Sequence, residues 1–154
     1  EIGVRLVGSE MCIRDRYCQP GVYPALSQEE VLDYCADALC RCHAAGVRVI
    51  RLGLHDTPSL RQNMIAGYFH PAYGELVESR LYLRQLQKAA ADCGKPELFV
   101  ETALRTMSKV LGQCGCNREA MAKQGVTLRV QESAAVLSGT FLTDGRCYGI
   151  YTAK

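Results

Sequence analysis

The chain has 154 residues, of which 48% are hydrophobic and 22% are charged, and its formal net charge is +2. This composition excludes an intrinsically disordered chain, because aliphatic residues are plentiful and the net charge is small. It also excludes a membrane-spanning helix, since no stretch approaches the roughly 18 consecutive apolar residues that such a helix needs. Nine cysteines are scattered through the sequence without a Cys-x-x-Cys pair or a secretory signal. This pattern favours reduced thiols and a cytoplasmic location over a disulfide framework.

Residues 1–16 are set apart from the rest of the sequence. The chain begins with Glu1, and residues 6–16 read Leu-Val-Gly-Ser-Glu-Met-Cys-Ile-Arg-Asp-Arg. This string resembles one translated frame of a sequencing-library adapter; the alternative is a short natural strand followed by a polar turn. On the adapter interpretation, the natural sequence upstream of Tyr17 is missing here. We therefore leave residues 1–16 out of the fold prediction.

A helix is predicted from residue 28 to the residue before Gly46. Ser27 and Glu30 have the spacing of a capping box, in which a hydroxyl and a carboxylate bond the free amides at a helix start. Apolar residues then recur at helical spacing, which indicates a face turned toward a core. A glycine at the end suits the left-handed conformation in which helices often finish. The apolar residues of this stripe are Val31, Cys35, Ala38, Leu39 and Cys42.

Residues 47–54 predict a buried strand. The run is apolar, rich in β-branched residues and hardly alternates, which is typical of a strand covered on both faces in a parallel sheet. A polar turn follows, and Thr57 and Pro58 have the residue types of a helix cap and a first helical position. The order of helix, buried strand, polar turn and helix predicts one repeat of an α/β fold.

A loop and a long helix are predicted next. Residues 63–74 are rich in aromatic residues and glycine and have no clear period, whereas residues 75–91 regain helical spacing. The sequence Gly94-Lys-Pro96 ends that helix. We therefore place a boundary at residue 94, between a first segment over residues 17–93 and a second over residues 94–154.

The second segment predicts a strand over 98–100, helices over 104–111 and 117–124, and an alternating strand over 126–130. Residues 132–154 are less clear; their Asp144-Gly145 turn predicts a terminal hairpin. Between the two helices lies Gly112-Gln-Cys-Gly115. This order resembles the minimal KH motif, whose Gly-x-x-Gly loop clamps a nucleic-acid backbone.

Charge agrees with a nucleic-acid partner for this loop. Residues 104–131 hold five basic residues against Glu119 alone, whereas residues 17–103 are slightly acidic. Glycines let a phosphate approach backbone amides, and a helix start favours an anion. The alternative is a purely structural turn. The candidate RNA contacts are Lys109, Gly112, Gln113, Gly115, Asn117 and Arg118.

Common catalytic motifs are missing from the sequence. It has no P-loop, dinucleotide fingerprint, His-Glu-x-x-His or serine nucleophile elbow. The Cys-x-Cys pairs at 40–42 and 114–116 lack a second ligand pair at zinc spacing, and on a helix their sulfurs would point to different faces. We predict no metal site and no catalytic residue in this chain.

Three residues are candidates for a substrate or cofactor pocket: Arg51, His55 and His70. His55 follows the predicted strand, at the end where binding residues collect in barrels of parallel strands. Arg51 interrupts that strand, and a charge there needs an ion-pair partner or an anionic ligand. A structural salt bridge is the alternative for Arg51, and a staple of its own loop is the slightly favoured alternative for His70.

Several stretches resemble the C-terminal part of radical SAM proteins, in the clade related to the catalytic subunit of Elongator. They are residues 23–30, residues 49–54 and, most specifically, His70-Pro-Ala-Tyr-Gly-Glu-Leu-Val-Glu-Ser-Arg80; the segment from Met107 to Asn117 resembles the end of the radical SAM C-terminal extension. The resemblance implies a TIM-like barrel of which residues 17–93 are the end. It also implies a Cys-x3-Cys-x2-Cys loop that holds a 4Fe-4S cluster and cleaves S-adenosylmethionine. That triplet does not occur in these 154 residues.

We therefore expect an α+β fold: the last β/α repeat of a barrel, then a helical and KH-like βααβ extension. The expected function is a C-terminal fragment of a radical SAM enzyme, acting on tRNA or another RNA and inert alone. Its expected partner is the missing N-terminal half of the barrel. The alternative is a stand-alone KH-like RNA-binding module without catalysis. A complete small-molecule α/β enzyme has little support, because one repeat cannot close a sheet.

Overall fold

A computed structural model describes residues 26–54, 56–63 and 68–152. In chain order its helices are α2 (Gln28–Ala44), α3 (Pro58–Asn63), α4 (Tyr73–Cys93), α5 (Met107–Leu111) and α6 (Cys116–Lys123), with a 3-10 turn, η1 (Gln113–Gly115), before α6. The strands are β1 (Glu97–Thr102), β2 (Thr127–Glu132), β3 (Thr140–Thr143) and β4 (Arg146–Gly149). The predicted α+β class is confirmed. None of the helices in these ranges is long and apolar enough to cross a membrane.

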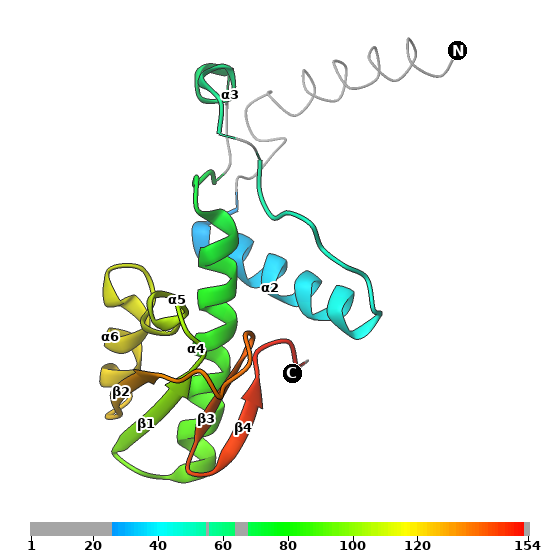
Figure 1. The fold of residues 1–154 in the computed structure, drawn as a ribbon. Coiled ribbons are helices and arrows are strands. Elements are labelled where there is room, and N and C mark those ends of the chain that lie inside the picture. Colours follow the sequence, from blue (N-terminus) through cyan, green and yellow to red (C-terminus); the bar gives the residue numbers. More distant parts are fainter. Residues whose placement is uncertain (1–25, 55, 64–67, 153–154) are drawn as a thin grey trace.

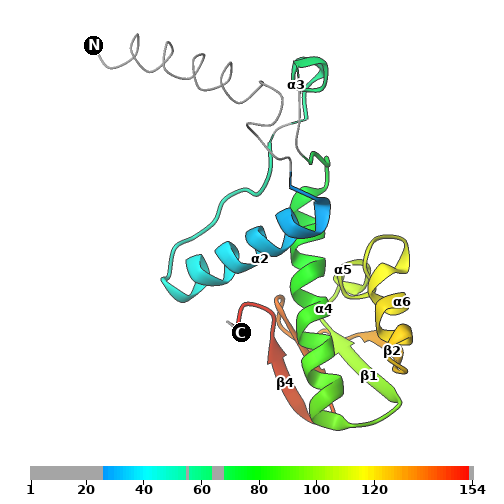
Figure 2. The ribbon, with the colours of Figure 1, turned by 180° about the vertical axis from the view of Figure 1, so that it is seen from behind.

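Helix α4 is the axis of the structure (Figure 1). Helix α2 crosses its N-terminal half, and the sheet lies against its C-terminal half, as the opposite view also shows (Figure 2). Helices α5 and α6 lie beside it and cover one end of the sheet. One hydrophobic core includes residues from both sides of Gly94. The two segments that we separated at residue 94 therefore share this core.

Helix α2 forms as the sequence predicts. Both hydrogen bonds of the capping box are present, from the Glu30 amide to Ser27 Oγ (3.3 Å) and from the Ser27 amide to Glu30 Oε2 (2.8 Å). The buried face differs by a small rotation from the predicted stripe. Ala38 is exposed, because the helix turns Leu32, Ala36 and Cys40 toward α4.

The prediction of a buried strand over residues 47–54 is wrong for this structure. The segment is extended but pairs with no strand, and Ile50 and Leu54 are 90% and 65% exposed. All strands in the described ranges belong to one sheet formed by residues 97–149. Near its end the segment packs on the protein: Leu52 lies against the core, and Gly53, at φ +79°, is so close to Tyr73 that a Cβ would be 2.9 Å from the tyrosine Cβ.

Helix α4 begins two residues earlier than predicted and ends, as predicted, at Gly94, which adopts the left-handed conformation. Nearly half of its residues are buried, because it contacts α2 on one side and the sheet on another. Helix α3 starts at Pro58, in agreement with the expected first helical position.

The sheet has the order β2-β1-β3-β4. Strand β1 pairs parallel to β2 and antiparallel to β3, and β3 and β4 form the predicted hairpin. The hairpin turns at Asp144 and Gly145, with φ of 47° and 73°, the positive values that a two-residue turn of this kind requires. The inner face is aromatic at its centre: the Phe141 ring stacks on Tyr148 with centroids 5.3 Å apart and lies 6.4 Å from that of Tyr82 on α4.

Candidate functional site at the α5–α6 loop

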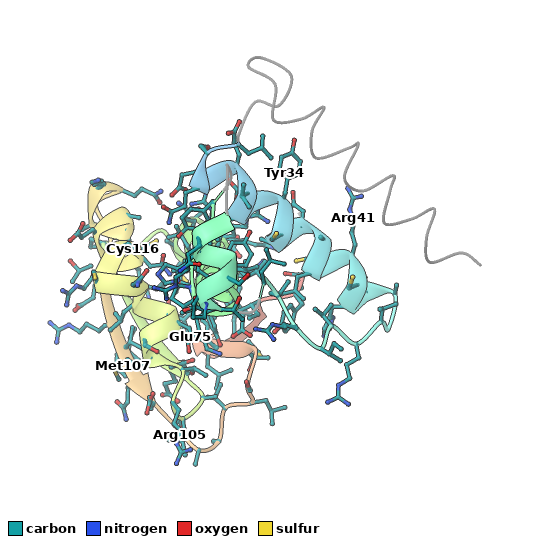
Figure 3. The ribbon with its side chains drawn as sticks, turned by 90° about the horizontal axis from the view of Figure 1, so that it is seen from above. Tyr34, Arg41, Glu75, Arg105, Met107 and Cys116 are labelled. Atoms are coloured by element: carbon teal, nitrogen blue, oxygen red, sulfur yellow. The ribbon has the colours of Figure 1, made fainter. Side chains whose placement is uncertain are left out.

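The loop between α5 and α6 lies against the N-terminal half of α4. The predicted order of strand, helix, Gly-x-x-Gly, helix and strand is present, since β1-α5 precedes the loop and α6-β2 follows it. Viewed from above, α6 with Cys116 lies beside α4, whose first turn carries Glu75 (Figure 3). The loop therefore lies next to residues 70–80, the stretch that carries the most specific part of the family resemblance.

Both glycines of the loop are required by its backbone. Gly112 and Gly115 have φ of 80° and 81°, a region that residues with a side chain rarely adopt. A Cβ on Gly112 would also lie 2.5 Å from Cys116 Sγ and 2.7 Å from the Asn117 amide nitrogen. Gly112 is thus fixed by close packing as well as by conformation, and its carbonyl accepts a hydrogen bond from the Gly115 amide at 3.0 Å.

Asn117 anchors the loop to α4. Its side chain is 3% exposed, and Nδ2 donates to the Ser79 carbonyl (3.0 Å), to Ser79 Oγ (3.0 Å) and to the Val110 carbonyl (3.1 Å). Asn117 was predicted as an RNA contact; in this structure its side-chain amide is used inside the protein. Its role is to hold α5, α6 and α4 together.

Two predictions made for separate sites converge at this loop. His70 Nε2 lies 3.5 Å from Gln113 Nε2, which brings a predicted pocket residue to a predicted RNA contact. The other ring nitrogen of His70 accepts a hydrogen bond from the Ala72 amide at 3.1 Å, just before α4 begins. This second bond is local, between residues two apart, and the choice between a pocket residue and a staple of the loop stays a prediction.

The two basic candidates, Lys109 and Arg118, differ in whether their charge is neutralised within the protein. Lys109 Nζ lies 2.5 Å from Glu78 Oε2, and both side chains are about three-quarters buried, so this lysine is neutralised within the protein. Arg118 is exposed, and a Cβ placed on Gly115 would lie 3.6 Å from its Nη2. The Arg118 guanidinium therefore lies over the glycine loop, where it can meet an anion.

A cavity lies on each side of the loop. The larger, of about 500 Å³, is bounded by α2, α4 and α6, and the smaller, of about 280 Å³, by α4 and α5. The larger cavity is lined by leucines of α2 and α4 together with polar residues such as Glu29 and Arg80. The polar residues that line the smaller cavity include Glu75, Ser108, Lys109 and Gln113.

The remaining pocket candidates are not brought to this loop by the described structure. Arg51 is exposed on the extended segment 47–54. His55 lies outside the described residues. The predicted pocket formed by these two residues with His70 thus stays a prediction.

Arg80, the last residue of the specific stretch, binds α2. It donates to both carboxylate oxygens of Asp33 and forms an ion pair with Glu29 at 2.7 Å. Arg84, one turn further on, bridges Asp33 and Asp37. Hydrogen bonds from Arg80 hold the pKa of the Asp33 carboxyl well below its usual range. No local pattern indicates these ion pairs, because the arginines lie 47 to 51 residues from the aspartates that they bind.

Tyr73 joins the same region to α2 through a different contact. Its hydroxyl lies 3.2 Å from Cys35 Sγ, and burial raises the pKa of Tyr73 above its ordinary value. The stretch 70–80 therefore contacts three parts of the protein: α2, the segment 47–54 and the α5–α6 loop.

Part of the chain matches a known protein family. Residues 15–82 match the Radical_SAM C-terminal domain. The match covers less than half of the chain, includes the whole stretch 70–80, and supports a C-terminal part of a radical SAM protein. No curated protein and no solved structure shows significant similarity to the chain.

The residues in hand do not fit the cofactors of that family. A 4Fe-4S cluster of the radical SAM kind needs three thiolates in a Cys-x3-Cys-x2-Cys loop, and this spacing does not occur in the sequence. Within the ranges that the structure describes, no three histidine, cysteine or acidic side chains are grouped so that they could hold a metal ion. No catalytic step is therefore assigned to a residue of this chain.

Proposed function

We propose that the chain is the C-terminal part of a radical SAM enzyme of the Elongator-like clade, and that this part binds an RNA substrate such as tRNA. The observation that carries the first half is the family match over residues 15–82. The stretch 70–80 supports it, because its side chains connect α4 to α2, to the segment 47–54 and to the α5–α6 loop. These contacts give a structural role to the residues that carry the family resemblance.

The exposed segment 47–54 supports a missing partner. Ile50, Leu54 and Val47 are more than half exposed on an extended backbone, and apolar surface of this kind is costly to leave in water. We assign it to the N-terminal half of the radical SAM barrel, against which it forms the next parallel strand. His55 would then follow the end of that strand and Arg51 would lie within it, which keeps both as candidates for the reaction site.

The glycine loop supports the second half of the proposal. Gln113 is exposed and Gly115 is half-buried beside the cation of Arg118, whereas Gly112 is buried at the base of the turn. The surrounding residues 104–131 are basic. Glycines expose backbone amides to a phosphate, and an arginine adds charge-assisted hydrogen bonds. Lys109 contributes less, because Glu78 already neutralises it.

RNA binding is tested by fluorescence anisotropy with labelled tRNA over a series of salt concentrations. The logarithm of the affinity should fall linearly with the logarithm of salt, with a shallow slope set by few phosphate contacts. Replacing Gln113 and Cys114 together by aspartate should abolish binding. Arg118→Ala should weaken it roughly tenfold, the loss of one strong charged contact. Arg41→Ala removes an equal charge from the end of α2 and should have little effect; equal losses for both variants would contradict the loop assignment.

The dependence on a missing barrel half is tested separately. After anaerobic iron and sulfide reconstitution, the chain alone should give no stoichiometric 4Fe-4S signal in electron paramagnetic resonance and should form no 5′-deoxyadenosine. A stoichiometric cluster would contradict the proposal. Sequencing the genomic DNA upstream of the Tyr17 codon should show an in-frame Cys-x3-Cys-x2-Cys segment. RNA binding without such a segment would instead favour the stand-alone RNA-binding module.

A further inference from the structure

Cys114 and Cys116 of the α5–α6 loop form a pair of accessible thiols. Both are exposed, and both line the larger cavity beside the loop. A pair at this spacing within a helix would point to different faces, as the sequence analysis assumed. The structure differs because Cys114, at φ +53°, lies in a left-handed turn before α6, whereas Cys116 is the first residue of the helix.

The backbone between the two cysteines already brings them to disulfide distance. The separation of Cα atoms two residues apart is set by the angles of the residue between them, here Gly115 at φ 81° and ψ 17°. These angles describe a turn close to a left-handed helix, in which that separation is about 5.4 Å. Disulfides join Cα atoms separated by roughly 4.4–6.8 Å. Only glycine adopts this conformation readily, so the intervening residue suits the pair.

The chain contains a natural comparison, the pair Cys40 and Cys42. It has the same spacing, but both residues lie inside the regular helix α2. Cys40 is buried and its thiol contacts the Thr152 carbonyl at 3.9 Å, whereas Cys42 is only half-buried. Side chains two apart on a helix diverge, so this second pair cannot close without breaking the helix.

We propose that Cys114 and Cys116 form a reversible disulfide by exchange with a low-molecular-weight disulfide such as oxidised glutathione. One thiolate attacks a sulfur of the small disulfide, forms a mixed disulfide and releases one thiolate. The second protein thiolate then attacks the first cysteine's own sulfur in the mixed disulfide, which forms the Cys114–Cys116 bond and releases the second small thiolate. The two protons of the cysteines end on the released thiols, so the protein is oxidised by two electrons and the small disulfide is reduced. Because Gln113 precedes Cys114, closure acts on the loop residue that contacts His70.

The test incubates the reduced full-length chain in glutathione buffers of graded ratio, quenches with acid, alkylates free thiols and digests with trypsin. Cleavage after Lys109 and Arg118 yields the peptide 110–118, which contains these two cysteines and no other. We expect this peptide to carry no alkyl groups and to have a mass two hydrogens below that of its dithiol form. Treatment with dithiothreitol should restore the dithiol. Trypsin cuts at Arg41, so a bridge between Cys40 and Cys42 would instead join two peptides. At the same glutathione ratio, the Cys40–Cys42 bridge should be roughly tenfold less abundant than the Cys114–Cys116 bridge. Disulfide exchange requires thiols that are accessible and correctly placed, and Cys40 is buried.

Variants complete the test. In Cys114→Ser, Cys116 should keep one glutathione as a stable mixed disulfide, because no second thiol can displace it. Cys147→Ser removes an exposed thiol elsewhere and should leave the 110–118 result unchanged. The proposal is overturned if wild-type peptide 110–118 stays a dithiol in oxidising buffer, carries glutathione on both thiols, or is bridged to another cysteine.

Discussion

Residues 47–54 and residues 97–102 are two apolar runs of similar strand-forming composition, but only the second forms a strand. Strand β1 lies between β2 and β3, and its Leu98, Val100 and Thr102 are buried against the helices. The run 47–54 has no neighbouring strand, and Ile50 is 90% exposed. The difference shows that composition indicates whether a segment can form a strand, whereas the strand forms only where a neighbouring strand is present to pair with it.

The largest expected effect separates the sheet, in which Phe141 of β3 pairs with Thr102 of β1, from the run 47–54. Phe141→Ala removes a fully buried ring that stacks against Tyr148 and should lower the free energy of unfolding by about 3–5 kcal/mol. Ile50→Ala should change it by less than about 0.5 kcal/mol, because the side chain is already in water. Urea denaturation followed by circular dichroism measures both. A large loss for Ile50→Ala would mean that the run 47–54 packs within this chain and needs no partner.

The next effect tests the anchor of the α5–α6 loop. Asn117→Ala leaves the Ser79 and Val110 carbonyls without their side-chain donor in a buried site and should cost about 2–3 kcal/mol. Gln131→Ala, on the exposed face of β2, is the matched control and should cost less than about 0.5 kcal/mol. Equal unfolding midpoints for wild type and Asn117→Ala would show that the buried amide does not hold the loop.

Gly112→Ala tests whether the loop needs its glycine for space as well as for conformation. The added Cβ would collide with Cys116 Sγ and with the backbone of Asn117, so we expect a loss of about 2–3 kcal/mol. Gly145→Ala in the β3–β4 turn has a positive φ but open space around it, and should lose only about 1 kcal/mol. Thermal and urea unfolding should therefore rank Gly112→Ala below Gly145→Ala in stability; the reverse order would contradict the packing argument.

The smallest expected effect concerns pH. The folded-state pKa of Asp33 lies below its unfolded value, so the stabilisation is present above about pH 4 and is lost as the pH falls further. Because Asp33 is 40% exposed, we expect only about 1 kcal/mol. Asp33→Asn should therefore be less stable than wild type at pH 7, and the difference should shrink as the pH falls from 4 to 2.

Asp56→Asn is the control for this pH effect. Asp56 pairs with Arg61, which is 62% exposed on the short helix α3, and the substitution should change stability by less than about 0.5 kcal/mol. Urea titrations at both pH values measure the two variants. A difference between wild type and Asp33→Asn that is the same at pH 7 and pH 2 would show that the charge of Asp33 is not what stabilises the α2–α4 contact.

Much of the fold was predictable because its signals are local. The capping box at Ser27, the left-handed Gly94 and the Asp144-Gly145 turn each act within a few residues, and each element forms where predicted. Parallel pairing of β1 with β2 was not predicted, since register depends on contacts distant in sequence. The strand predicted over residues 47–54 failed for a related reason: a strand requires a partner, and periodicity does not supply one.

The candidate site was predictable only as separate pieces. The Gly-x-x-Gly loop and His70 were each visible in the sequence, but their approach through Gln113 depends on how α5 and α6 pack on α4. Asn117 was placed among the candidate RNA contacts because it directly follows the Gly-x-x-Gly loop. Its burial depends on acceptors from Ser79, a residue 38 positions away, which no local pattern reveals.

The last described residues of the chain lie against α2. The Tyr151 ring stacks on His43 with centroids 4.6 Å apart, and the Thr152 carbonyl meets the Cys40 thiol. The C-terminal end thus lies close to where α2 gives way to the segment 47–54 (Figure 1). On the proposal that the segment 47–54 docks to a barrel half, a dye attached at position 152 of a Thr152→Cys variant would consequently report that docking by proximity.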